Sequence, residues 1–300
     1  MIVSDASTTA TADAQLKLSE KRNRSRAWYR LLLRDNVATT AGVILLLIVL
    51  SAVFAPQLTD NNPERAQSGM RLIGPSTTHW LGTDELGRDI LSRILFGGRI
   101  SLTIGFLAVG LGLGIGGTLG LLAAYFNKLD NVIMRLMDVI LSLPGILLAI
   151  AIVAALGPGV YEVMIAVGIG AIPIFARVTR SSVLSVRSEV YIEAVQAVGA
   201  SDMRIITRHI LPNSFAPVLV YATLQMATAI LSASILSFLG LGPQPPTPEW
   251  GAMVSAGRRY MTETPHVVMM PGFAIFIVIL CFNLLGDGLR DALDPSVHDR

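Results

Sequence analysis

The residues most often used in catalysis and metal binding are few in this sequence and stand far apart. It has one cysteine, and none of its four histidines forms an HxxxH pair. A disulfide framework or a zinc cluster cannot be built from such a set. The phosphate-binding patterns GxxxxGKS and GxxxxGKT are absent as well. We therefore expect no catalytic residue, no metal site and no cofactor, and any ATP that is used would be bound by another chain.

Glycines are dense in one apolar run of the sequence. Gly112, Gly114 and Gly117 have the GxGxxG spacing of dinucleotide sites, but the run lacks the strand–turn–helix context that such a site needs. Gly112, Gly116 and Gly120 are spaced by four residues, which places a smooth strip on one helix face. We interpret this strip as a surface for close packing of another helix.

The longest polar segment between two apolar runs still carries helix signals. Residues 186–198 predict a helix, which Gly199 can end in the left-handed conformation. Ser201 is a good N-cap for a second, short helix, and Asp202 suits its positive end. Leu211-Pro212 would then end that helix.

The second short helix has two distinct sides. Arg204 and Arg208 are neighbours at i and i+4, and Met203, Ile206 and Ile210 lie together on another side. A short helix with an apolar side and a basic pair predicts a docking surface for another macromolecule. The alternative is a segment that only connects its neighbours.

The composition indicates a membrane protein. Hydrophobic residues make up 52% of the 300 residues, charged residues only 15%, and the mean hydropathy is +0.61. About a quarter of the residues of a soluble domain are charged, so a water-soluble globule is excluded, as are disorder and collagen. The net charge of +2 gives no electrostatic support for nucleic-acid binding.

Crossing a bilayer takes about 20 residues; five apolar runs are that long, and the fourth of six, residues 163–176, is long enough if Tyr161 and Glu162 lie at the membrane interface. They predict an all-α polytopic membrane protein with six transmembrane helices, the third kinked at Pro144. No ionisable residue lies in the middle of a run, which argues against an ion-coupled secondary carrier. The predicted spans cover residues 36–59, 100–128, 139–161, 163–176, 210–248 and 267–286.

The basic residues predict the orientation. With the N-terminus in the cytoplasm, 16 Lys and Arg residues fall inside and 7 outside. An excess of Lys and Arg marks the cytoplasmic side, so both termini are expected to be cytoplasmic.

The exported side would then carry two notable segments. Residues 60–98 start polar and end in an amphipathic helix, which Asp84 could cap. That helix lies either along the outer membrane surface or against the bundle. Residues 243–250 contain four prolines and predict a stiff, extended loop.

The polar segment also contains a family pattern. Glu193-Ala194, Gly199 and Leu211-Pro212 resemble the loop motif of ABC importer permeases, which reads EAA, three residues, G, nine residues, then I-x-LP. Val195 replaces the second Ala of that motif, and His209 replaces the Ile.

Other segments extend the resemblance over residues 79–295. They are similar to the second, "C" type of permease in dipeptide and oligopeptide importers, and glutathione importers look equally close. The matching segments are His79 with Leu81-Gly82-Thr83-Asp84, Gly87-Arg88-Asp89, Ser92-Arg93, Arg99 with Ser101-Leu102, Ser237 to Gly242, Gln244 to Gly251, Phe282-Asn283 and Gly286 to Pro295.

The resemblance implies an ABC type I importer permease fold and a chain that forms half of a pore without hydrolysing ATP. It implies as partners a second permease, two ATP-binding cassette ATPases, an extracytoplasmic substrate-binding protein and membrane lipid, and no nucleic acid. The expected substrate is a dipeptide or oligopeptide, with glutathione or nickel as alternatives. A secondary carrier and a scaffold or sensor remain as other classes.

The resemblance also implies a division of the chain, placed in the inner membrane of a bacterium. Residues 1–36 would form a cytoplasmic tail with an interfacial anchor, 37–98 the first span and exported segment, 99–290 the permease core, and 291–300 a cytoplasmic tail. An ATPase-coupling loop would cover 177–213. Its expected residues are Glu193, Ala194, Gly199, Ser201, Asp202, Arg204, Arg208, Leu211 and Pro212.

Overall fold

The structure is a computed structural model that describes residues 28–293, so the predictions about tail residues 1–27 and 294–300 lie outside it. Within that range the chain forms helices joined by turns, with an isolated bridge between Thr83 and Asp89. The elements are α2 (Trp28–Leu32), α3 (Asn36–Val53), α4 (Ala55–Leu58), η1 (Ser68–Met70), α5 (Ile90–Tyr125), α6 (Asn127–Leu141), α7 (Gly145–Leu156), α8 (Val160–Arg187), α9 (Val190–Ala197), α10 (Asp202–Ile205), η2 (Ile206–Ile210), α11 (Leu211–Phe238), α12 (Trp250–Gly257), η3 (Arg258–Tyr260) and α13 (His266–Leu293).

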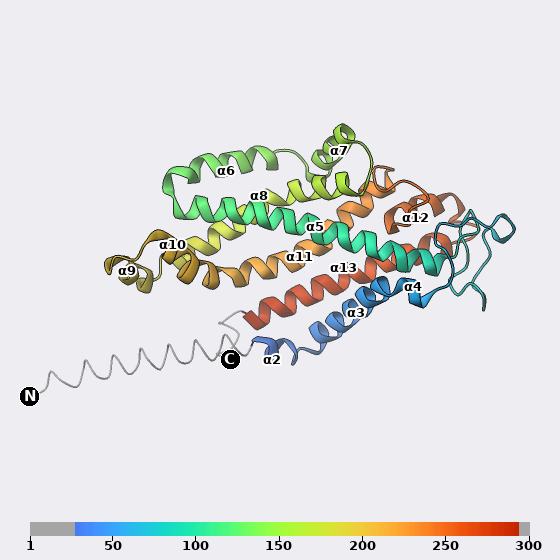
Figure 1. Cartoon of the computed structure of the whole chain (residues 1–300), viewed down its shortest axis with the longest axis horizontal. Coiled ribbons are helices and arrows are strands. Elements are labelled where there is room, and N and C mark those ends of the chain that lie inside the picture. Colours follow the sequence, from blue (N-terminus) through green and yellow to red (C-terminus); the bar gives the residue numbers. More distant parts are fainter. Residues whose placement is uncertain (1–27, 294–300) are drawn as a thin grey trace, which may run out of the picture.

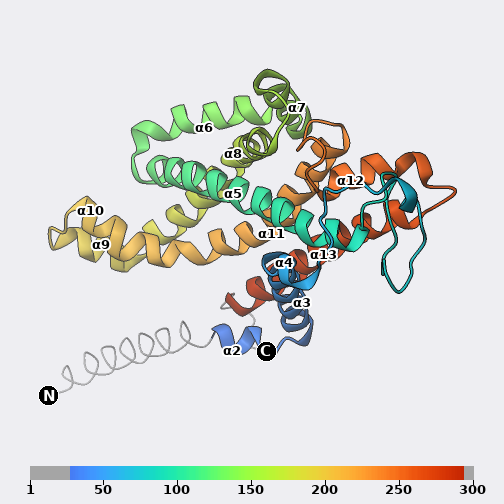
Figure 2. The same cartoon turned by 45° about the vertical axis from the view of Figure 1, so that its right-hand side comes forward.

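The long helices run along the long axis of the molecule, and short helices lie at both ends (Figure 1). We name the two ends by the short helices that they carry, the α10 end and the α12 end. Figure 2 shows the same separation after a 45° turn.

The prediction of six transmembrane helices is confirmed, and the third span is a broken one. Helices α6 and α7 are bent by 85° around Pro144, where the sequence predicted a kink, and together they can form one span. The other five helices that are long and apolar enough to cross a membrane are α3, α5, α8, the continuous helix Asp202–Phe238 and α13.

Helix α5 begins before the predicted second span and continues unbroken for 36 residues. Its N-cap is Asp89, whose carboxylate accepts a hydrogen bond from the Ser92 amide at 2.8 Å. The expected cap, Asp84, is wrong because its carboxylate is engaged in the preceding turn, where it accepts from the amides of Leu86 and Arg88 at 2.9 Å.

The amphipathic start of α5 packs against the bundle and does not lie along a membrane surface. Gly97 and Gly98 face the indole ring of Trp250 in α12, and a Cβ on Gly98 would lie 3.0 Å from that ring. The indole N–H of Trp250 donates a hydrogen bond to the Ile94 carbonyl at 3.0 Å. This side of α5 is therefore covered by protein.

The polar segment differs from its prediction at both boundaries. Helix α8 continues to Arg187, so the first part of the expected loop belongs to the fourth span. Leu211-Pro212 was expected to end a helix, which is wrong, because one helix runs from Asp202 to Phe238. The π turn η2 lies directly before this pair. A widened turn accommodates the proline ring and its missing N–H, so the helix continues.

The glycine strip of α5 faces α8. A Cβ placed on Gly112 would lie 2.7 Å from the Ala171 Cβ, and one on Gly116 or Gly120 would overlap a backbone carbonyl oxygen of α8. Close approach of two backbones increases van der Waals contact, which is a main source of helix association where lipid replaces water.

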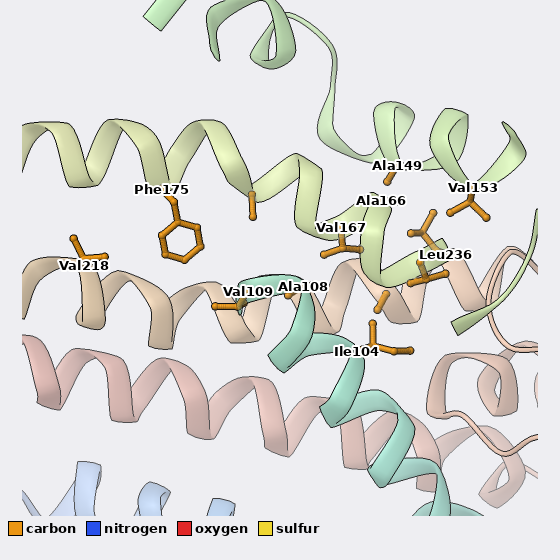
Figure 3. Packing of buried hydrophobic residues seen from close by; sticks show 14 residues of the cluster. Ile104, Ala108, Val109, Ala149, Val153, Ala166, Val167, Phe175, Val218 and Leu236 are labelled. Carbon is orange, nitrogen blue, oxygen red and sulfur yellow. The ribbon is translucent and has the colours of Figure 1, made fainter. Parts of the chain in front are cut away.

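The main buried cluster surrounds this helix pair and extends to α7 and α11. Figure 3 shows Val167 of α8, Ile104 of α5 and Leu236 of α11 at one end of the cluster, and Phe175 of α8 with Val218 of α11 at the other. The core therefore holds four elements together between the two ends.

Candidate functional site

The segment expected to dock a partner projects beyond the long helices at the α10 end (Figures 1 and 2). It consists of α9, α10 and the turn between them. Gly199 forms this turn with φ +79°, in the left-handed region where the sequence placed it. Its amide donates to the Gln196 carbonyl at 2.9 Å, and the Ala200 amide donates to the Val195 carbonyl at 3.3 Å. A Cβ at Gly199 would meet open space, so glycine is not needed here to avoid a steric clash. It is needed because the positive φ angle is unfavourable for other residues.

The second helix of the segment begins at the expected residue but without the expected side-chain bond. Ser201 has extended N-cap dihedral angles, and its carbonyl accepts from the Ile205 amide at 3.0 Å, but its hydroxyl makes no cap hydrogen bond. Asp202 accepts a hydrogen bond from the Tyr125 hydroxyl at 2.6 Å. This bond fastens α10 to the last residue of α5, and sequence reasoning did not identify Tyr125.

A small apolar base holds the segment against the bundle. Ile192, Ile205 and Ile210 are buried together with Ala124 and Val183. Of the predicted apolar side, only Ile210 is fully buried, whereas Met203 is 70% exposed. Ile205, and not Met203, is therefore the residue of α10 that faces the bundle. The π turn after it brings residues five apart onto one helix face, so Ile205 and Ile210 are buried on the same side.

The outer side of the segment is exposed in the described part of the chain. We call it the docking surface, and it combines apolar and charged side chains. Val190 and Val198 are 78% and 83% exposed, and Arg204 and Arg208 form no ion pair with a described residue. We define the docking surface by seven of the exposed residues, Val190, Glu193, Ala194, Val198, Met203, Arg204 and Arg208.

The α12 end contains a buried ion network that sequence reasoning did not assemble. His79 Nδ1 lies 2.9 Å from Asp89 Oδ1, and Arg88 Nε donates to Asp84 Oδ2 at 2.6 Å. Arg93 Nε lies 3.4 Å from the same Asp84 oxygen. All five side chains are buried. The sequence signals were the density of acidic and basic residues before α5 and the family resemblance of the segments that contain all five residues.

The proline loop is tied to this network. Arg93 donates hydrogen bonds to the Pro63 carbonyl at 2.7 Å and to the Pro246 carbonyl at 3.3 Å. One guanidinium therefore joins the segment before α5 to the loop before α12. The bond to Pro246 fixes the proline loop against α5.

Glu249 secures the start of α12. Its carboxylate is fully buried and accepts from the Ala252 amide at 2.9 Å and from the Ser101 hydroxyl at 3.0 Å. Burial raises the pKa of this carboxyl, and both hydrogen bonds act against that shift. Ser101 is far away in the sequence, so only the fold brings the pair together.

Two ion pairs fix α6 along α8. Arg180 donates two hydrogen bonds to the Asp130 carboxylate, both at 2.6 Å, and Arg177 donates to Asp138 at 2.6 Å. In the described part of the chain, no group of three His, Cys, Asp or Glu residues could hold a metal ion. The exposed feature that could bind a partner is the docking surface at the α10 end.

Comparisons with known proteins cover most of the chain. Residues 116–299 match the family described as "Binding-protein-dependent transport system inner membrane component", and residues 24–75 match "N-terminal TM domain of oligopeptide transport permease C". The dipeptide transport system permease protein DppC of Alkalihalophilus pseudofirmus is 49% identical over 91% of this chain and 90% of its own length. The glutathione transport system permease protein GsiD of Pectobacterium atrosepticum is 49% identical over 91% of both chains.

Solved structures show the same fold at low sequence identity. An inward-facing structure of the MetNI methionine ABC transporter superposes with a TM-score of 0.56 at 20% identity, covering 67% of this chain and 97% of that one. An amino acid ABC transporter gives a TM-score of 0.52 at 16% identity, covering 63% and 88%.

Proposed function

The chain belongs to the family of binding-protein-dependent transport system inner membrane components, and we propose that it admits dipeptides or oligopeptides. It is a multi-pass permease subunit of an ABC importer. Members of this family work with an ATPase, a substrate-binding protein and a second permease. The proposed complex contains two ATPase subunits, which hydrolyse the ATP, and this chain provides half of the pore.

The docking surface carries the proposal for coupling. It lies on α9, on α10 and on the start of the helix that continues into α11, and it is packed from beneath by Ile192, Ile205 and Ile210. Its charged side chains form no ion pair with a described residue. Two exposed arginines suit an acidic groove on an ATPase. The α10 end is then cytoplasmic, in the inner membrane of a bacterium, with both termini on that side. A reporter fused after Arg300 should be active only as a cytoplasmic reporter.

Movement would reach the pore through two connections. Helix α10 continues without a break through η2 into α11, so displacement of the docking surface displaces that span. The Tyr125–Asp202 hydrogen bond connects the same surface to α5. ATP binding would draw the two ATPases together and move these spans between inward-open and outward-open states as rigid bodies. In this proposal residues 99–290 are the moving core, with 177–213 as its coupling region.

Charge reversal tests the coupling assignment. In Arg204→Glu with Arg208→Glu, the purified complex should lose its ATPase subunits and its substrate-stimulated ATP hydrolysis, because losing a docked arginine pair costs about 2–5 kcal/mol. The matched control is Arg258→Glu with Arg259→Glu at the α12 end, which should retain the ATPases. Full retention of ATPases and uptake in the first variant would refute the docking assignment.

Glutathione is the second candidate substrate, because a relative named for glutathione transport is as similar as the one named for dipeptide transport. The reconstituted complex with its binding protein should be tested with a labelled dipeptide, glutathione and Ni²⁺. Uptake of the dipeptide in preference to the other two is expected. Preferential uptake of glutathione or Ni²⁺ would refute the proposed peptide substrate, while the assignment of the chain as a permease would stand.

A further inference from the structure

Three long helices end or begin beneath the docking segment, which consists of α9, α10 and the turn between them. Helix α5 ends at Tyr125, α6 begins two residues later at Asn127, and α8 ends at Arg187. Figure 1 shows the turn between α5 and α6 at the α10 end of the molecule. The ends of α5 and α8 pack with α10 in one buried cluster, so these elements form a common base for the segment.

The half-buried side chain of Arg187 connects these helix ends. One guanidinium nitrogen, Nη1, donates hydrogen bonds to the Ala124 carbonyl at 2.8 Å and to Asn127 Oδ1 at 3.1 Å. Carbonyls in the last turn of a helix lack partners within that helix, and they form the negative end of its dipole. A cation on the Ala124 carbonyl therefore suits the end of α5 and ties α8 to the turn between α5 and α6.

Arg187 reaches the docking segment only through the ring of Tyr125. Its Cζ atom lies over this ring, 5.5 Å from the centroid. The hydroxyl of the same ring donates a hydrogen bond to Asp202, the first residue of α10, at 2.6 Å. Among the residues that the structure describes, no ion pair joins Arg187 to Asp202 directly. The ring is thus the link between the guanidinium and α10.

We propose that Arg187 is a positioning residue for coupling, which holds the Tyr125 ring where its hydroxyl meets Asp202. With the ring held, a displacement of α10 moves the ends of α5 and α8 together with the start of α6. Without the guanidinium, the ring can adopt another rotamer and leave Asp202 without its donor. The inference rests on the proposed coupling at the docking surface, and it concerns transmission of movement, because the docking surface itself is unchanged.

Substrate-stimulated ATP hydrolysis in the complete reconstituted complex tests this role. Arg187→Gln removes the cation, and Lys128→Gln is the control with the same change in net charge. Lys128 is exposed on the neighbouring turn and forms no hydrogen bond or ion pair with a described residue. The measured quantity is the ratio of the rate with dipeptide-loaded binding protein to the basal rate, per assembled complex. ATPase content is measured by co-purification.

We expect Arg187→Gln to retain its ATPases and to lower this ratio about threefold or more, because two hydrogen bonds and the ring contact are lost together. Arg187→Lys should restore most of the ratio, since both hydrogen bonds come from one nitrogen and a lysine ammonium carries three donors. Arg187→Gln combined with Tyr125→Phe should be no worse than Arg187→Gln alone, because residues acting through one contact are not additive.

Equal ratios in Arg187→Gln and Lys128→Gln would overturn the proposal, even if the yield of the complex falls. Loss of the ATPases from Arg187→Gln, a lysine variant as defective as the glutamine variant, or losses that multiply in the double variant would also overturn it. If Arg187→Gln does not assemble, Asn127→Ala removes one of the two hydrogen bonds and should lower the ratio about twofold, and an unchanged ratio would reject the role. Absence of stimulation in the unmodified complex would instead refute the proposed coupling itself.

Discussion

Two sets of charged residues, one at the α12 end and one at the α10 end, differ in burial and in pairing. At the α12 end, His79, Asp84, Arg88, Asp89 and Arg93 are buried and paired, whereas at the α10 end Arg204 and Arg208 are exposed and form no ion pair with a described residue. Buried pairs fix neighbouring segments in one geometry, and removing one partner is costly. Exposed charges contribute little to the fold and remain available to a partner. The buried pairs therefore fix the α12 end, and in our proposal the exposed arginines leave the α10 end available to the ATPase.

Among the changes that test this comparison, Asp84→Ala should cause the largest loss of stability. The change leaves Arg88 and Arg93 buried without their carboxylate and removes an acceptor for two backbone amides. We expect a loss of about 3–5 kcal/mol in stability, measured as lower thermal stability of the purified complex. Asp60→Ala, at an exposed aspartate on the same segment, is the control and should change little. Equal melting of both variants would contradict a structural role for the network.

Gly116→Leu should destabilise the contact between α5 and α8, which lies between the two ends of the molecule. The new side chain would collide with the Ile172 carbonyl and force α5 away from α8, at a cost of about 1–3 kcal/mol or more. Gly114→Leu is the matched control on the same helix, where a side chain meets open space. Complex yield and thermal stability are measured for both. If the two variants behave alike, the glycine strip is not a close contact.

Gly199→Val should separate coupling from folding at the α10 end. A valine at φ +79° is strained by about 1–3 kcal/mol, so the turn would relax and tilt the docking surface. Substrate-stimulated ATP hydrolysis should fall while complex yield stays near normal. Ala197→Val, an exposed neighbour in α9, serves as control. Unchanged hydrolysis in Gly199→Val would show that the turn geometry is not needed for coupling.

Tyr125→Phe should give the smallest effect, because it removes one hydrogen bond and preserves the ring. Loss of the bond to Asp202 should cost about 1 kcal/mol. The expected result is weaker stimulation of ATP hydrolysis by substrate, with the basal rate retained. Tyr161→Phe alters an exposed tyrosine and should have no effect. Identical stimulation in the two variants would remove Tyr125 from the coupling path.

Sequence patterns predicted the spans well because hydropathy depends on local composition. They divided α5 into an amphipathic helix and a separate span because Arg99 was counted as a polar boundary. In the fold, Arg93 pairs with Asp84, and Arg99 donates to the Ala52 and Val53 carbonyls, so the helix continues past both. Pro144 indicated a kink, but the size of the bend depends on how α7 packs.

The turn at Gly199 was predictable because glycine at a helix end is a local signal. The pairs that secure the two ends were not, since they join distant parts of the chain. Glu249 meets Ser101 across 148 positions, and Asp202 meets Tyr125 across 77. Pro212 misled the prediction because a π turn, which has no clear sequence signature, carries the helix past it.

Helix α5 has a mechanical consequence that follows from its continuity. At 1.5 Å per residue its 36 residues measure about 54 Å. Its N-cap is Asp89 of the buried ion network, and its last residue is Tyr125, which bonds to the docking segment. A lever of this length tilted by about 5° about its midpoint displaces each end by about 2 Å. If an ATPase moves the docking surface, as we propose, a tilt of α5 would carry that movement from Tyr125 to the opposite end of the same helix.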